Sequence, residues 1–172
     1  ANATKVSILI NMSPDMSITV YVADNGCGMD IEGLKNAMKY GSKARTQKNS
    51  LGKFGLGLKT ASSAFCKQFS LISRNSAESP LNKVQWDIDY IASNGSWLLQ
   101  FPTIESDEED LLEEIANNNS GTLLVWKKVD RLLKDYKSIS NAQKGLAKIV
   151  DSLMFHLSMV FQRFLDFNDE RV

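Results

Sequence analysis

Two glycine-rich clusters, well separated in the chain, constrain its fold more than any other feature. The first reads D-N-G-C-G-M over Asp24–Met29, and the second reads G-K-F-G-L-G over Gly52–Gly57. Because glycine lacks a Cβ atom, each cluster allows the backbone to approach a ligand closely. The first cluster also carries an acid, and a helix-like sequence follows the second. The pair predicts a nucleotide site with one end that reads the base and another that holds the phosphates.

Neither of the two familiar phosphate-binding loops fits these clusters. A P-loop has a lysine directly after its last glycine, whereas Leu58 follows Gly57 and Lys59 comes one residue late. The dinucleotide fingerprint G-x-G-x-x-G needs a third glycine. The chain has Ile31 and Thr60 at the two positions where that glycine would fall. The clusters therefore indicate a different kind of nucleotide-binding loop.

The motifs resemble those of the GHKL ATPases, the superfamily of gyrase, the heat-shock chaperone ATPase, histidine kinases and MutL. Ala1–Val6 is similar to the end of that family's first motif, Asp24–Met29 to its adenine loop, Gly52–Ser62 to its second glycine box, and Ser120–Trp126 to its late Gly-Thr strand. The box continues as L-K-T-A-S, which is closest to the MORC and MutL side of the superfamily. The motifs follow the family's order and cover most of the chain, so the resemblance is specific.

The resemblance implies ATP and Mg²⁺ as cofactors. Asp24 would accept a hydrogen bond from the adenine amine, and a bridging water would bind the ring nitrogen. Thr122 would support Asp24 and this water. Backbone amides of the glycine box would hold the phosphates at a helix start, where the helix dipole favours anions. Lys43 and Lys53 would add cations, and Lys59 would support the box. The predicted cofactor-binding residues are Asp24, Gly26, Gly28, Met29, Lys43, Gly52, Lys53, Gly55, Leu56, Gly57, Leu58 and Thr122.

The resemblance places the catalytic half of the family's site upstream of Ala1. There a Glu activates the attacking water and an Asn holds Mg²⁺, and neither Asn2 nor Glu32 falls at these family positions. We therefore expect no catalytic residue and no metal ligand in this chain. We interpret it as a fragment of a larger ATP hydrolase, without its N-terminal motif helix and its downstream domain.

Three functions are compatible with the motifs. In an ATPase, ATP would close a lid over Gly41–Leu51, and relatives in that state dimerise and clamp a client. In a histidine kinase, the chain would be the ATP module, but the single His156 is followed by Leu157 rather than by an acid. We expect His156 to be a partly buried helix residue. A nucleotide sensor that does not hydrolyse ATP is the third alternative.

Hydrophobic periodicity predicts an α/β fold. Period-two alternation and turn signals predict strands over Lys5–Asn11, Ser17–Ala23, Phe69–Ser73, Lys83–Asp89, Trp97–Phe101 and Gly121–Lys128, and helical spacing predicts helices over Asp30–Tyr40, Leu56–Lys67 and Asn141–Phe167. We expect the acidic stretch Glu105–Glu114 to be a solvated loop and the start of a short helix. The pattern and the resemblance both imply a two-layer sandwich with a mixed, mostly antiparallel sheet covered on one face by helices, the Bergerat-type ATP-binding fold.

Composition limits the remaining choices. The chain of 172 residues is most simply one domain, residues 1–172, with a long C-terminal helix over 141–167. Its formal net charge is zero, which gives no reason to expect wholesale attraction to nucleic acids or membranes. Cys27 and Cys66 make no disulfide framework, which favours a reduced, cytoplasmic setting with both thiols buried. We expect a homodimer of the full-length protein and no membrane partner, and the sequence does not identify a client protein or DNA.

Overall fold

The computed structural model describes residues 2–39, 56–133 and 135–166. The chain divides into two compact units. One unit comprises Ala1–Ser13 and Ser17–Arg131, and the other comprises Pro14–Met16 and Leu132–Val172. The first unit contains every strand of the described residues, and the second contains two consecutive helices.

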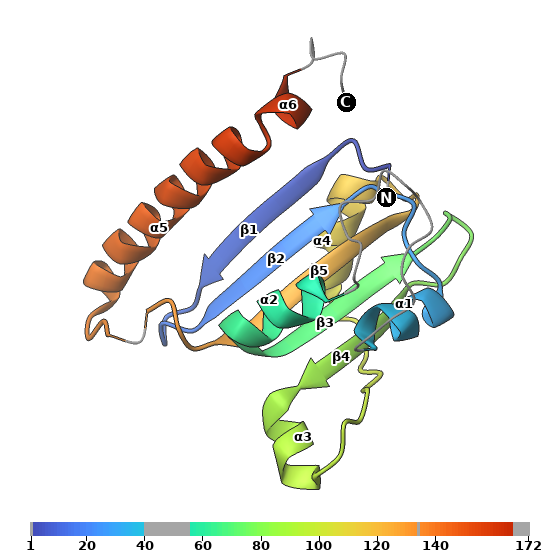
Figure 1. The fold of residues 1–172 in the computed structure, drawn as a ribbon, viewed down its shortest axis with the longest axis horizontal. Helices are drawn as coiled ribbons and strands as arrows, with labels where there is room; N and C mark the ends of the chain where they lie inside the picture. Colours follow the sequence, from blue (N-terminus) through green and yellow to red (C-terminus); the bar gives the residue numbers. More distant parts are fainter. Residues whose placement is uncertain (1, 40–55, 134, 167–172) are drawn as a thin grey trace. The chain divides into compact units, whose positions relative to one another are not determined.

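The first unit is built on a five-stranded antiparallel sheet (Figure 1). In spatial order its strands are β1 (Val6–Met12), β2 (Ile18–Asp24), β5 (Gly121–Val129), β3 (Cys66–Arg74) and β4 (Asn82–Asp87). β5 thus lies between β2 and β3, although it comes last in the chain. Because neighbouring strands run antiparallel, the end of β2 lies beside the start of β5 and the end of β3.

Alternate side chains of each strand point to opposite faces of the sheet and bury two separate cores. In β5, Leu123 and Val125 belong to one core, and Leu124 packs against the other. The first core also contains residues of α4 (Ser106–Ala116), and the second contains residues of α1 (Ile31–Met38). The sheet therefore carries helices on both faces.

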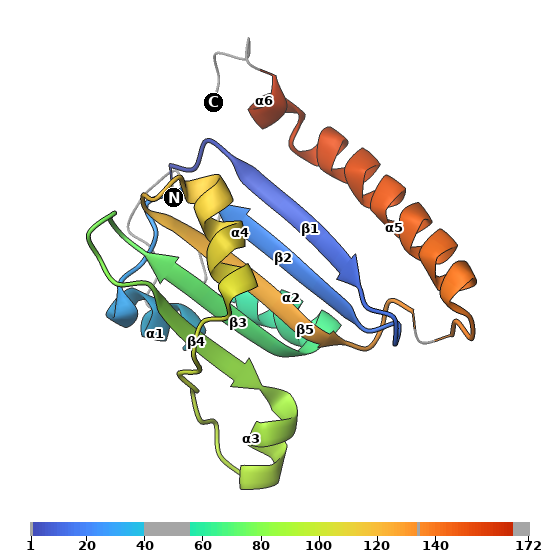
Figure 2. The ribbon, with the colours of Figure 1, turned by 180° about the vertical axis from the view of Figure 1, so that it is seen from behind.

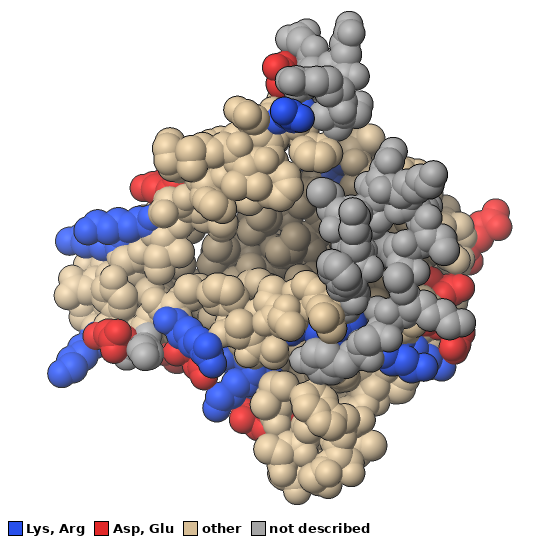
Figure 3. Space-filling model, in the orientation of Figure 1, with Lys and Arg blue, Asp and Glu red and all other residues tan. Residues whose placement is uncertain are grey.

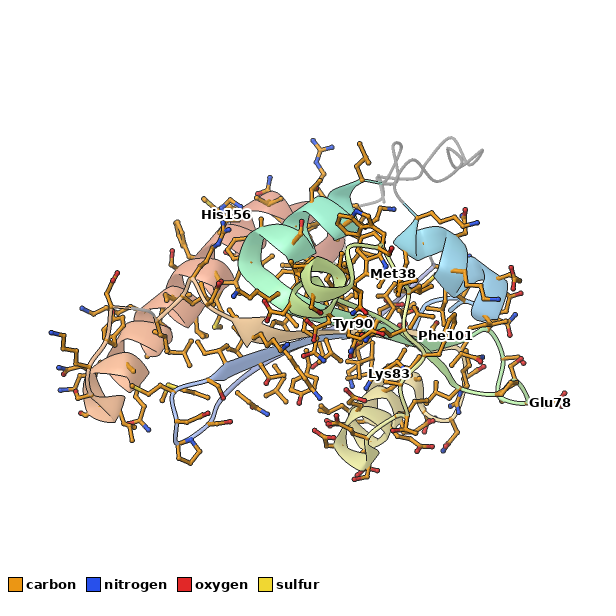
Figure 4. All side chains as sticks on the ribbon, turned by 90° about the horizontal axis from the view of Figure 1, so that it is seen from below. Met38, Glu78, Lys83, Tyr90, Phe101 and His156 are labelled. Atoms are coloured by element: carbon orange, nitrogen blue, oxygen red, sulfur yellow. The ribbon has the colours of Figure 1, made fainter. Side chains whose placement is uncertain are left out.

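The figures show the same layers. α1 and α2 (Gly57–Phe65) lie in front of the sheet in Figure 1, and α4 lies in front of it in the reverse view of Figure 2. In Figure 4 the sheet is seen edge-on, with Met38 on the side of α1 and Lys83 on the side of α4. The predicted α/β class and the antiparallel sheet are confirmed, and α4 adds a helix on the second face.

The helices on the α1–α2 face begin where the sequence predicts. Asp30 is the N-cap of α1, and its Oδ1 accepts a hydrogen bond from the Gly33 amide at 2.7 Å. Leu34 and Met38 of this helix are buried, as their spacing predicts. The next helix, α2, begins at Gly57, inside the glycine box.

The region after β4 differs from the prediction. β4 ends at Asp87, whose carboxylate caps α3 (Ile88–Asn94) by accepting from the amides of the next turn. α3 ends at Gly95, which has the left-handed φ of +61° that favours glycine. The predicted strand Trp97–Phe101 is wrong, because Gln100 makes only an isolated bridge to β4. Its Trp97 instead packs against β4, with the centroid of its ring 5.1 Å from that of Trp86.

The acidic stretch Glu105–Glu114 lies almost wholly in the helix α4 and has one buried carboxylate, so the predicted helix start is confirmed and the predicted solvated loop is wrong. Glu108 of α4 is fully buried, and its Oε2 lies 2.6 Å from the Nζ of Lys83. The same oxygen accepts the Glu105 amide at 3.0 Å, as in a capping box. Its other oxygen, Oε1, accepts no hydrogen bond among the described residues and lies 3.4 Å from the ammonium of Lys127.

The second unit contains α5 (Ile139–Val160) and α6 (Gln162–Leu165), where the sequence predicts one helix. The helix breaks at Phe161, and residue 167 lies outside the described residues. The N-cap of α5 is Ser138, which accepts a hydrogen bond from the Asn141 amide. His156 is exposed rather than partly buried (Figure 4). None of the helices in the described part of the chain has the length and hydropathy that a membrane span requires.

Candidate functional site

A row of three polar side chains crosses the sheet at the end of β2. Asp24 is the register partner of Thr122 in β5, and Thr122 is the partner of Ser73 in β3. Their neighbours along the strands, Ala23, Leu123 and Ile72, belong to the core that contains residues of α4. Because successive side chains of a strand point to opposite faces, the three polar residues lie on the other face, which α1 and α2 cover. The adenine-loop acid and the late threonine, which are far apart in the sequence, are therefore neighbours.

Ser73 joins this row to the glycine-rich loop. Its hydroxyl donates to the Gly121 carbonyl at 2.6 Å and lies 3.0 Å from the Oγ1 of Thr122. It also accepts the Met29 amide at 2.9 Å. Sequence reasoning missed Ser73 because a serine within an ordinary strand gives no signal. Only the register of β3 against β5 brings it to the site.

The loop itself is held by local hydrogen bonds and by close backbone packing. The Oδ1 of Asp24 accepts the Gly26 amide at 2.8 Å, which is the usual turn chemistry of aspartate. Gly28 has a φ of +59°, and a Cβ built there would lie 1.8 Å from the carbonyl oxygen of Arg74. A Cβ at Gly121 would lie 2.7 Å from the carbonyl oxygen of Asp24. Gly28 and Gly121 are thus required by the packing of the protein itself.

Asn25 ties the same loop to the residues that precede β1. Its Oδ1 accepts the amides of Thr4 and Lys5 at 2.9 and 2.8 Å, and its Nδ2 donates to the Thr4 hydroxyl at 2.8 Å. Asn25 is not among the residues predicted for the site. Its position between Asp24 and Gly26 in the D-N-G motif is the signal that could have found it.

Hydrogen bonds of Arg74 and Glu113 fix the segment that leads into β5. The guanidinium of Arg74 donates to Glu113 of α4 at 2.7 Å and to the carbonyl of Asn119 at 2.8 Å. The same Glu113 oxygen accepts the Asn118 amide at 2.9 Å. Because Asn119 lies just before β5, these contacts fix the approach of the chain to Thr122.

The N-terminus of α2 forms the other part of the candidate site. Leu56 precedes the helix and is 43% exposed, and a Cβ built on Gly57 would meet no atom of the described part of the chain within 4 Å. Leu58 and Met29 both pack against the buried core on the α1–α2 face. The base-reading loop and the start of α2 therefore share one face of the sheet and one supporting core. Four further predicted residues, Lys43, Gly52, Lys53 and Gly55, lie outside the described residues.

Lys59, in the first turn of α2, is bound to the end of α1. Its side chain is almost completely buried, and its Nζ donates to the carbonyls of Ala37 at 2.9 Å and Lys39 at 2.5 Å. Desolvation by burial lowers the pKa of this ammonium. Helix-terminal carbonyls lack partners within their own helix, so Lys59 satisfies the end of α1 and fixes it against α2. This contact agrees with the expectation that Lys59 supports the glycine box.

The described residues include no group of three or more His, Cys, Asp or Glu side chains that could hold a metal ion. We assign Mg²⁺ no ligand among the described residues. On the α1–α2 side drawn in Figure 3, Lys and Arg are interspersed with Asp and Glu rather than gathered by sign. This agrees with the zero net charge of the chain.

Comparison with known proteins identifies the family. The model of the family described as "Histidine kinase-, DNA gyrase B-, and HSP90-like ATPase" matches residues 1–122. No curated protein matches the chain.

Solved structures of topoisomerase ATPase regions are similar at low identity. The ATPase and transducer domains of DNA topoisomerase II from Balamuthia mandrillaris are 17% identical, with a TM-score of 0.43, over 74% of this chain and 32% of that one. The ATPase region of Saccharomyces cerevisiae topoisomerase II bound to ICRF-187 is 16% identical, with a TM-score of 0.45, over 86% and 37%. The chain thus spans about a third of these solved chains. Because the family model matches well over half of its residues, the chain belongs to the histidine kinase-, DNA gyrase B- and HSP90-like ATPases.

Proposed function

We propose that this chain binds ATP between the Asp24 loop and the N-terminus of α2. The observation that supports this most strongly is the row of Asp24 and Thr122 across β2 and β5, on the sheet face that also carries Gly57. The carboxylate would accept the adenine amine, and Thr122 would hold the water on the ring nitrogen. The free amides at the start of α2, including those of Gly57 and Leu58, would bind the phosphates.

The open surroundings of Gly57 support this assignment. In the first helical turn a Cβ at Gly57 would meet no atom of the described residues within 4 Å, and the φ of Gly57 is not in the left-handed region. A glycine costs a helix up to about 1 kcal/mol relative to alanine. Among the described residues, neither packing nor backbone geometry requires a glycine here, and a ligand that needs the space beside it would explain the glycine.

ATP hydrolysis with Mg²⁺ in the parent protein, closure of residues 41–51 over the nucleotide, and dimerisation are further proposals that rest on the family resemblance alone. So is a relationship to the MORC and MutL branch. Residues 41–51 lie outside the described residues. A histidine kinase module and a sensor without hydrolysis are the alternatives, and ATP binding is common to all three.

Calorimetric titration of ATP into the protein and its Asp24→Asn variant tests the proposal. The asparagine Oδ1 can still accept the Gly26 amide, so the turn is kept. Its amide group presents a donor toward the adenine amine, and a hydrogen bond to a charged group contributes about 1.5–3 kcal/mol. We therefore expect an affinity for ATP about 10- to 100-fold weaker.

Asp30→Asn provides the matched control in the same loop. Asp30 caps α1 through Oδ1, and asparagine caps a helix equally well. This variant should bind ATP as the unmodified protein does. Equal affinities of all three proteins for ATP would refute the role assigned to Asp24.

A further inference from the structure

Ser73 has every hydrogen-bonding position occupied. A serine hydroxyl offers one donor and two acceptor lone pairs. Its proton is used on the Gly121 carbonyl at 2.6 Å, because a carbonyl oxygen can only accept. One lone pair takes the Met29 amide at 2.9 Å. The contact of 3.0 Å with Thr122 must therefore run from the threonine hydroxyl to Ser73.

This direction fixes what Thr122 can offer to a ligand. Once its proton is given to Ser73, the threonine oxygen has only lone pairs left. Its neighbour across the sheet, Asp24, is a carboxylate and is also an acceptor. The two side chains that face the base-reading end of the site thus present acceptors and no donor.

We propose that Ser73 is a specificity-determining residue that makes the base-reading end of this site select a 6-amino purine against a 6-oxo purine. The inference rests on the proposed function, and Ser73 acts through Thr122 rather than by touching the nucleotide. Adenine presents a 6-amino donor, which the Asp24 carboxylate accepts, and the Thr122 oxygen accepts from the water on the ring nitrogen. Hypoxanthine, the base of inosine triphosphate, presents an oxygen acceptor at the same position, where Asp24 and Thr122 offer it no donor.

Removing the Ser73 hydroxyl releases the proton of Thr122. In Ser73→Ala the threonine can rotate and donate to a 6-oxo group, directly or through a water. If Ser73 had a purely structural role, its loss would weaken the binding of ATP and of inosine triphosphate by the same factor, and the ratio of the two affinities would not change. The affinity ratio therefore separates selection of the base from support of the loop.

The experiment measures calorimetric affinities for ATP and inosine triphosphate. We expect the preference for ATP to fall about fivefold in Ser73→Ala, which corresponds to one neutral hydrogen bond. Ser70→Ala is the matched control, since Ser70 lies on the same strand, is equally buried and bonds Gln85. It should leave the ratio unchanged. Ser73→Cys keeps a side chain of similar size with a weak acceptor, and should shift the ratio in the same direction.

A double variant tests the mechanism. With Thr122→Val there is no threonine proton to release, so adding Ser73→Ala should no longer change the ratio. If the unmodified protein binds ATP and the ratio is the same in Ser73→Ala, or falls equally in Ser70→Ala, this inference is overturned while the proposed function stands. If the folded, unmodified protein binds neither nucleotide, the proposed function fails and this inference fails with it.

Discussion

Gly28→Ala should destabilise the protein because of two backbone effects that the structure separates. A Cβ at this position would lie 1.8 Å from the carbonyl oxygen of Arg74, 2.7 Å from its carbon and 3.1 Å from the Gly121 nitrogen. These are main-chain atoms of strands, which cannot rotate away as a side chain can. Real Cβ atoms essentially never approach a neighbour closer than 3.0 Å, so the loop must move away from β3.

The magnitude follows from these contacts. A non-glycine residue at a φ of +59° costs about 1–2 kcal/mol. Moving the loop away from β3 also breaks the hydrogen bond from the Met29 amide to Ser73, a net loss of about 1 kcal/mol. We therefore expect the free energy of unfolding to fall by about 2–3 kcal/mol, which is large beside the total stability of about 5–15 kcal/mol for a domain.

Urea unfolding of Gly28→Ala beside Gly95→Ala measures the difference. Gly95 has nearly the same φ, +61°, and a Cβ there would meet no atom within 4 Å. It therefore reports the backbone strain alone, about 1–2 kcal/mol. If the two variants lose the same stability, the argument that Gly28 is required by the close approach of β3 is refuted.

Other buried groups give three further predictions. Glu108→Gln leaves Lys83 without its carboxylate and should lower the free energy of unfolding in urea by about 3–5 kcal/mol. Adding Lys83→Met should recover part of this loss, and strictly additive losses in the double variant would argue against coupling of the two side chains. Burial raises the pKa of Cys66 to about 12 from 9.0. Between these pH values the native state holds a proton that the unfolded state releases, so stability falls as pH rises. Cys66→Ala should reduce this fall, and an unchanged slope of the urea midpoint against pH would contradict the prediction. Lys59→Met leaves two carbonyls at the end of α1 without the donor that Lys59 supplies, and should speed amide hydrogen exchange in α1. Exchange at the rate of the unmodified protein would show that α1 does not depend on Lys59.

The sequence predicts most of the sheet because burial on one or both faces leaves a periodic pattern. Val6–Met12 and Ile18–Asp24 fall within a residue of the predicted strands. The aromatic run Trp97–Phe101 also has strand-like composition, but ring contacts hold it in an irregular segment. β-propensity reports a half-buried surface rather than ladder pairing, so composition alone could not distinguish the two.

Polar residues with tertiary roles could not be predicted in the same way. Glu108 lies in an acidic run, and nothing in that run distinguishes it from its solvated neighbours until Lys83 is placed beside it. Ser73 becomes part of the candidate site only through the register of three strands. Cys27 was expected to be buried and is exposed, whereas Cys66 is buried as expected. The motif predicts that Gly28 lets the loop approach a ligand, and the structure shows that Gly28 approaches the protein's own backbone.

The most direct test of the central claim is calorimetric titration of ATP with Mg²⁺ into the protein and its Gly57→Val variant. Because this position is helical and a Cβ there would meet none of the described residues within 4 Å, the variant should unfold with a free energy within about 0.5 kcal/mol of the unmodified protein. We predict saturable binding of ATP by the unmodified protein and its loss in Gly57→Val, since the added side chain would occupy the approach to the phosphates. Equal binding by both proteins, or no binding by the folded unmodified protein, would contradict the assignment of an ATP site to this face of the sheet.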